Sequence, residues 1–135
     1  MIKGITYILK NDSTFQSIVG QNAALSKYKA YPVISPQTEV VPFSVCRMNS
    51  KRMIGKGRNE FECSFTVSSY HKNYDDVEDL DYAVVQALVP RTGTYNGVTF
   101  GYIEFENTSD SFEMQGELYG KVSSFNCQVT LTALT

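Results

Sequence analysis

Hydrophobic and polar residues alternate most regularly in two stretches of the chain, one near the middle and one near the end. In residues 60–68 the apolar positions are Phe61, Cys63, Phe65 and Val67, and the residues between them are polar. In the last stretch the apolar positions are Phe125, Cys127, Val129 and Leu131. A period of two predicts strands with one covered and one wet face, as in an antiparallel sheet.

Three other stretches carry apolar residues at helical spacing. Residues 2–10 have this pattern, and residues 13–19 have it after polar residues that can cap a helix and before Gly20, a common helix stop. The strongest helix is predicted over residues 75–89, with Asn73 or Asp75 as its cap. Acidic residues crowd its first turns, where the helix dipole favours them, and Pro90 follows its last turn.

The remaining segments predict further strands and turns. Residues 28–36 are expected to be extended because prolines restrict the residues before them. A strand is predicted over 39–48. Because Pro42 cannot donate to a ladder, this strand is expected either to lie at a sheet edge or to begin near Pro42, and 49–58 is predicted as a long hairpin tip. Turns are expected at Gly93 and at Asn96-Gly97.

The end of the chain is predicted to hold two more strands. The first covers residues 98–105, and residues 107–110 are predicted as a loop. The second runs from about 112 to 131, broken near Gly116 or Gly120. The expected fold is α+β, one domain over residues 1–135, with a mostly antiparallel four-stranded sheet and helices packed on one face.

Composition sets limits on the chemistry. The chain has 135 residues, 42% of them hydrophobic and 19% charged, and a net charge of −2, so the whole molecule has no strong attraction to nucleic acid or to an anionic membrane. No apolar run reaches the length of a membrane helix, and no signal peptide is visible at the start. We therefore expect a soluble protein made in a cytoplasm.

Residues with catalytic or metal-binding patterns are missing from the sequence. The single histidine, His71, has no companion at metal-ligand spacing, and Gly55-Lys56-Gly57 is too short for a phosphate loop. Cys46, Cys63 and Cys127 have no paired spacing and are expected to be reduced, mostly buried thiols. We therefore predict no catalytic, cofactor-binding or metal-binding residues, no cofactor, and a protein that is not an enzyme.

The order of elements resembles that of the tail-completion proteins of tailed bacteriophages, the tail terminators and tail-to-head joining proteins. The resemblance covers nearly the whole chain and rests on a Tyr-Pro after two short helices, a proline in the next strand, an acidic Ala-containing helix, an Asn-containing loop and a Leu-Tyr pair. In this sequence these features are Tyr31-Pro32, Val41-Pro42-Phe43, residues 76–88, Glu106-Asn107 and Leu118-Tyr119.

The resemblance implies a structural virion protein that assembles into a homohexameric ring at the head-proximal end of the tail tube. Its implied partners are copies of itself, the tail tube protein and a head connector or head-completion protein. Genome DNA would pass through the lumen without sequence-specific binding. The protein would be made in the bacterial host cytoplasm and located in the virion. The alternatives are a head-completion or tail-tube subunit, or a small cytosolic module that binds a peptide by strand addition at the Pro42 edge.

The charge distribution suggests how copies would meet in such a ring. A head-to-tail contact joins two different surfaces of the same chain, and oppositely charged patches suit it. We predict that residues 47–58 of one copy reach residues 75–81 of the next. The basic residues are Arg47, Lys51, Arg52, Lys56 and Arg58, and the acidic residues are Asp75, Asp76, Glu78, Asp79 and Asp81. The alternatives are a solvated loop and helix, or a loop that contacts DNA in the lumen.

Overall fold

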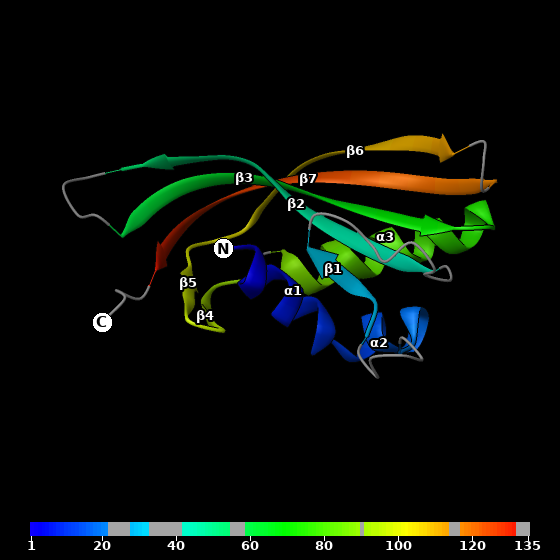
Figure 1. Ribbon diagram of the computed structural model, residues 1–135, viewed down its shortest axis with the longest axis horizontal. Coiled ribbons are helices and arrows are strands. Elements are labelled where there is room, and N and C mark those ends of the chain that lie inside the picture. The colour runs from blue at the N-terminus through cyan, green and yellow to red at the C-terminus, as the bar shows by residue number, and fades with distance from the viewer. Residues whose placement is uncertain (22–27, 33–41, 55–58, 90, 114–116, 132–135) are drawn as a thin grey trace.

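The computed structural model describes residues 1–21, 28–32, 42–54, 59–89, 91–113 and 117–131. In chain order the elements are α1 (Ile2–Lys10), α2 (Ser13–Val19), β1 (Ala30–Pro32), β2 (Phe43–Met53), β3 (Glu60–His71), α3 (Tyr74–Leu88), β4 (Gly93–Tyr95), β5 (Val98–Phe100), β6 (Glu104–Glu113) and β7 (Leu118–Leu131). The α+β class is confirmed, and Figure 1 shows the helices on one side of the sheet. The expected four strands are wrong, because the described residues form seven.

The three helices begin and end close to where the sequence predicts. The side chain of Asp12 accepts a hydrogen bond from the Phe15 amide at 2.9 Å, and Gly20 ends α2 with a φ of 67°. Asn73 caps α3 by accepting from the Asp75 amide at 3.0 Å. Each cap satisfies an amide that has no partner inside its helix, which fixes where the helix starts.

The sheet runs in the order β1-β2-β3-β7-β5-β4, and β6 also pairs with β7. All pairs are antiparallel except β1 with β2, which is parallel. Strand β7 therefore has β3 along one edge, while β6 and β5 share its other edge in succession. The four long strands β2, β3, β7 and β6 form a ribbon-like sheet along the long axis of the molecule (Figure 1).

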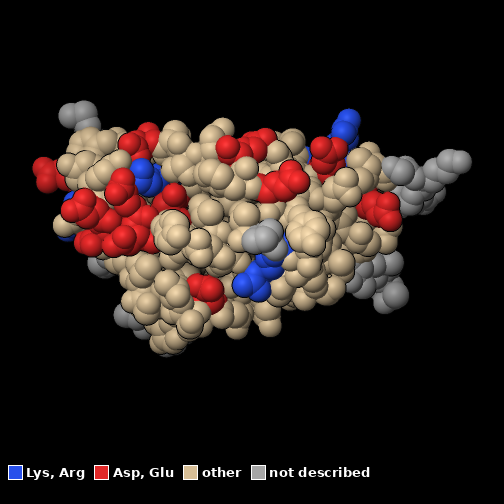
Figure 2. Space-filling view, turned by 180° about the vertical axis from the view of Figure 1, so that it is seen from behind, with Lys and Arg blue, Asp and Glu red and all other residues tan. Residues whose placement is uncertain are grey.

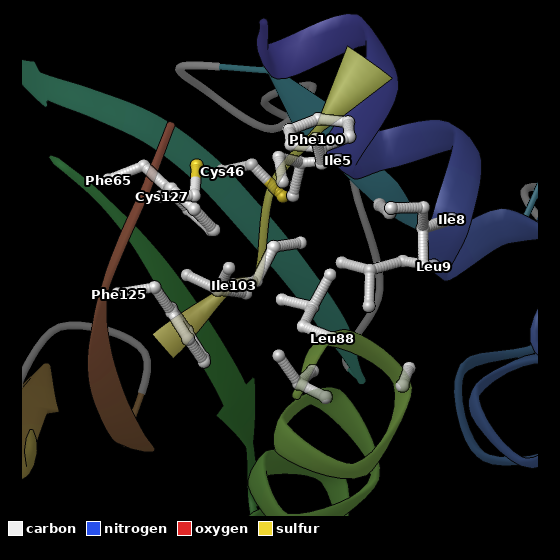
Figure 3. Close-up of a cluster of buried hydrophobic side chains, with 14 of the residues drawn as sticks. Ile5, Ile8, Leu9, Cys46, Phe65, Leu88, Phe100, Ile103, Phe125 and Cys127 are labelled. Atoms are coloured by element: carbon white, nitrogen blue, oxygen red, sulfur yellow. The ribbon is translucent and has the colours of Figure 1, made fainter. Parts of the chain in front are cut away.

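The core lies between the sheet and the helices (Figure 3). Phe65 of β3 and Phe125 of β7 are register partners, and their stacked rings lie 5.1 Å apart. Ile5 and Leu9 of α1 and Leu88 of α3 pack against this layer from the helix side. The alternation in β3 and β7 thus selects one face for burial, as the sequence predicts.

Four strand predictions are corrected by the structure. The predicted strand from about 112 to 131 belongs to two strands, because Phe112 lies in β6 and pairs with Tyr119 of β7. Residues 49–53 are not a hairpin tip, because β2 continues to Met53 and pairs there with Phe61. The predicted strand 98–105 is two strands, β5 and β6, separated by residues 101–103. Residues 107–110 are not a loop but the middle of β6, which pairs with β7 throughout. Polar residues misled the prediction because an exposed strand needs no apolar face.

The cysteine prediction is confirmed within the described chain. Cys46, Cys63 and Cys127 are buried free thiols. Burial raises the pKa of both Cys46 and Cys127 to about 12, because desolvation disfavours the thiolate. All three thiols behave as small apolar side chains of the core.

Candidate subunit interface

The basic residues of the sequence lie on the half of β2 that extends beyond the helices. Phe43 to Cys46 are buried, whereas every residue from Arg47 to Met53 is exposed. Figure 1 shows this end of the β2–β3 hairpin reaching past α1 and α3. We call residues 47–53 the basic ribbon. Lys56 and Arg58 belong by sequence to the connection from β2 to β3, and they lie outside the described residues.

Two of the cations in the basic ribbon already contact β3. Arg52 donates to Glu62 at 2.6 Å, and both side chains are exposed. The Lys51 ammonium lies 4.5 Å from the centre of the Phe61 ring. Arg52 and Glu62 are register partners on neighbouring strands, so this ion pair holds Arg52 on its own hairpin.

The edge of β2 is covered along only part of its length. Strand β1 pairs with residues 44–46 of β2, next to Pro42. An added peptide strand at the Pro42 edge would compete with this segment of the chain itself. Beyond residue 46, no other described strand pairs with the outer edge of β2, so a partner can approach the basic ribbon there.

The acidic residues lie on the first turns of α3. Asp75, Asp76, Glu78 and Asp79 are exposed. Figure 2 shows Asp and Glu side chains gathered at this end of the molecule. Because α3 starts directly after β3, its acidic first turns lie at one end of the long axis and the tip of the basic ribbon at the other (Figure 1). A single copy therefore does not bring the predicted partner residues together.

Asp81 differs from the other predicted acidic residues because it is buried. Its carboxylate accepts a hydrogen bond from the Ser123 hydroxyl, and Ser123 also shares a hydrogen bond of 2.7 Å with Thr108. Burial raises the pKa of Asp81 although the Ser123 hydrogen bond lowers it. Asp81 therefore connects α3 to β7 inside the chain and is not part of the exposed acidic surface.

Lys121 of β7 lies among the carboxylates at this end. Its ammonium donates to Asp110 at 2.7 Å and to the Tyr74 hydroxyl at 3.3 Å, and Glu78 is 3.8 Å away. The hydrogen bond to Asp110 raises the pKa of Lys121, and the same bond lowers the pKa of Asp110. The charge of Lys121 is thus balanced within the chain, and the exposed carboxylates of Asp75, Asp76 and Asp79 make no ion pair with it.

Sequence reasoning missed an aromatic cluster beside these acids. The Tyr119 ring lies 5.1 Å from that of Phe112 and 5.7 Å from that of Tyr74. Phe112 and Tyr119 line an open hollow of about 390 Å³ with Lys72 and Glu117. The predicted loop at 107–110 concealed this pairing, because Phe112 and Tyr119 become neighbours only when β6 and β7 are in register.

His71 lies at the end of β3, where its Nδ1 accepts from the Asn73 amide at 3.2 Å and its Nε2 is 3.8 Å from Asp76. No group of three potential metal ligands occurs in the described part of the chain. None of the helices that the structure describes is long and apolar enough to cross a membrane.

Comparisons with known proteins give a match of fold alone. No model of a known protein family matches the sequence, and no curated protein matches it. Among solved structures, a chain of the virion of a native gene transfer agent particle superposes with a TM-score of 0.71 at 13% identity. The match covers 94% of this chain and 92% of that chain, so the likeness of fold extends over nearly the whole molecule.

Proposed function

We propose that this protein is a structural virion subunit that forms a ring at the head-proximal end of a phage tail tube, as a tail terminator or tail-to-head joining protein. The observation that carries the proposal is the position of the two charged surfaces. The basic ribbon and the exposed acids of α3 lie at opposite ends of one chain (Figure 1). The likeness of the fold to a chain of a gene transfer agent virion supports the same role.

Opposite charges at opposite ends suit a head-to-tail contact. Each copy would offer its basic ribbon to the acidic end of the next copy, and the contact repeats until the rotation closes a ring. Charges of this kind mainly guide orientation and the rate of association. A hexamer is the ring size that the resemblance implies. In such a ring the subunit would contact the tail tube protein on one side and the head connector or head-completion protein on the other, with DNA passing through the lumen.

The proposed role is structural and not enzymatic. Two exposed carboxylates of the sheet have partners within the chain: Glu62 pairs with Arg52, and Glu106 accepts a hydrogen bond from Asn126. A tail-tube subunit is the second candidate in the same class, because the same head-to-tail contact also forms rings that stack. Filaments formed by the purified protein would favour that candidate.

Deletion of the gene from the phage or prophage that encodes it tests the role directly. Electron microscopy of the resulting particles should show filled heads beside detached tails. Overlong tails would identify a terminator, and tails of normal length would identify a joining protein. Intact virions in the deletion strain would contradict the proposed function.

A further inference from the structure

The acidic end of the molecule exposes large apolar side chains. Phe112 is 50% exposed, Tyr119 is 39% exposed and Tyr74 is 36% exposed. They form a continuous cluster, since Tyr119 contacts both of the other rings. Single exposed aromatic residues are common, but a cluster with a polar rim is typical of a protein–protein contact.

The rim of this cluster has an excess of negative charge. Tyr74 is the first residue of α3, so the exposed carboxylates of Asp75 and Asp76 follow directly after it. Glu117 and Lys72 line the hollow together with Phe112 and Tyr119. A partner that fills this hollow therefore needs an apolar side chain with a cation close by.

The basic ribbon offers this combination on one face. Met53 is 53% exposed, and Lys51 lies two residues before it on the same strand. Side chains two residues apart on a strand point to the same side, about 6.6 Å apart. Arg52 points to the opposite side and is held by Glu62 at 2.6 Å. The face that can enter the hollow therefore carries Met53 and Lys51 and not Arg52.

We propose that Met53 of a second copy of this chain enters the hollow lined by Phe112 and Tyr119, and that Lys51 of that copy faces the carboxylates of Asp75 and Asp76. A methionine fits an irregular hollow because its side chain is unbranched and flexible, and its sulfur contacts aromatic rings favourably. This inference rests on the head-to-tail contact of the proposed function and names the side chains that anchor it.

A second copy is the occupant that the chain itself supports. The two surfaces match in charge and in apolar character, and they lie at opposite ends of the same molecule (Figure 1). Opposite ends are the arrangement that lets every copy use both surfaces at once, as a repeating heterologous contact requires.

Site-directed cross-linking tests the contact. Full-length Met53→Cys and Phe112→Cys proteins are mixed and treated with a short bis-maleimide. The expected product is a covalent dimer that contains one copy of each variant. The native cysteines are buried, which keeps their background reaction low. The matched control is Met48→Cys with Phe112→Cys, because Met48 lies on the same strand and is 38% exposed. Absence of the Met53 product, or an equal yield from Met48, would overturn the proposal.

A second measurement removes the apolar contact without a cross-link. Met53→Asp and Phe112→Asp should each weaken self-association in sedimentation velocity by about tenfold or more, the effect expected of a side chain central to an interface. Tyr102→Asp is the control, because Tyr102 is 68% exposed and lies outside the cluster. Circular dichroism verifies that each variant is folded. Unchanged association of both Met53→Asp and Phe112→Asp would refute the insertion.

Failure of this inference is separable from failure of the proposed function. If the deletion strain yields detached tails but the Met53 and Phe112 cysteines do not cross-link, the virion role stands and the anchor is refuted. If the cross-link forms but the deletion strain yields intact virions, the contact stands and the virion role is refuted.

Discussion

The two halves of β2 are covalently continuous and yet lie in opposite surroundings. Phe43 to Cys46 are buried, and there the Ser44 hydroxyl shares a hydrogen bond of 2.8 Å with Ser69 inside the molecule. Arg47 to Met53 are exposed. Both halves pair with β3 along their length, apart from an irregularity between Met48 and Ser50. Pairing with β3 is thus common to both halves, whereas, among the described residues, pairing with β1 and burial by other elements occur only in the first half.

Because of this difference, we expect one half of β2 to determine the stability of the fold and the other half to determine assembly. Buried side chains contribute to folding because they leave water, whereas exposed strand residues contribute little to it. The exposed half remains available to another copy of the chain. We therefore expect substitutions in the covered half to change the free energy of unfolding, and substitutions in the basic ribbon to change association.

The largest effect is expected for Phe65→Ala in the covered part of the sheet. Phe65 is fully buried and stacks on Phe125, so the change leaves a cavity and should lower the free energy of unfolding by about 3–5 kcal/mol. Urea denaturation measures this change. Met53→Ala is the matched test of the exposed half and should stay within about 0.5 kcal/mol of the unchanged protein. Equal losses at both positions would contradict the comparison.

A smaller and pH-dependent effect is expected for Asp81→Asn. Burial raises the pKa of Asp81 in the folded protein above its ordinary value, so the folded state binds the proton more tightly than the unfolded state. The contribution of Asp81 to stability should therefore fall as pH rises from the ordinary carboxyl range through the raised pKa. Asparagine carries no charge and can still accept from Ser123, so the variant should lack this decline.

Unfolding free energies of both proteins, measured from about pH 3 to pH 8, provide the test of the Asp81 prediction. Their difference should be constant at the acidic end and should shift in favour of Asp81→Asn as pH rises. A difference that shifts in favour of the unchanged protein with rising pH would contradict the assignment.

The smallest effect on stability is expected for charge reversal at Lys51 and Arg52 of the basic ribbon and at Lys56, which follows the ribbon in the sequence. Replacing Lys51, Arg52 and Lys56 by Glu should change the free energy of unfolding by about 1 kcal/mol or less, because exposed ion pairs contribute little. The same variant should assemble less well, most clearly at low salt, where charges are least screened. Size-exclusion chromatography with light scattering measures assembly. Adding Asp75→Lys and Asp76→Lys to the triple variant should restore assembly. Normal assembly of the triple variant without these two changes would refute the charge contact.

The sequence predicted the helices better than β6, a strand that pairs with β7 alone among the described strands. Capping residues such as Asp12 and Asn73 act within one turn, so their effect can be read locally. The alternation of β3 and β7 also indicated the buried face, because one side of each strand is apolar. Strand β6 was partly missed because its middle, residues 107–110, is polar and mostly exposed, and its strand conformation comes from pairing with β7.

The same distinction applies to the candidate interface. Sequence alone determined the composition of the two charged segments and their separation along the chain. Only the tertiary structure decided that Asp81 is buried against Ser123, that Arg52 is held by Glu62, and that Phe112 meets Tyr119. The physical reason is that capping and side-chain periodicity depend on neighbours a few residues away. Burial, ion pairing across strands and surface clusters depend on strand register, which joins residues far apart in the sequence.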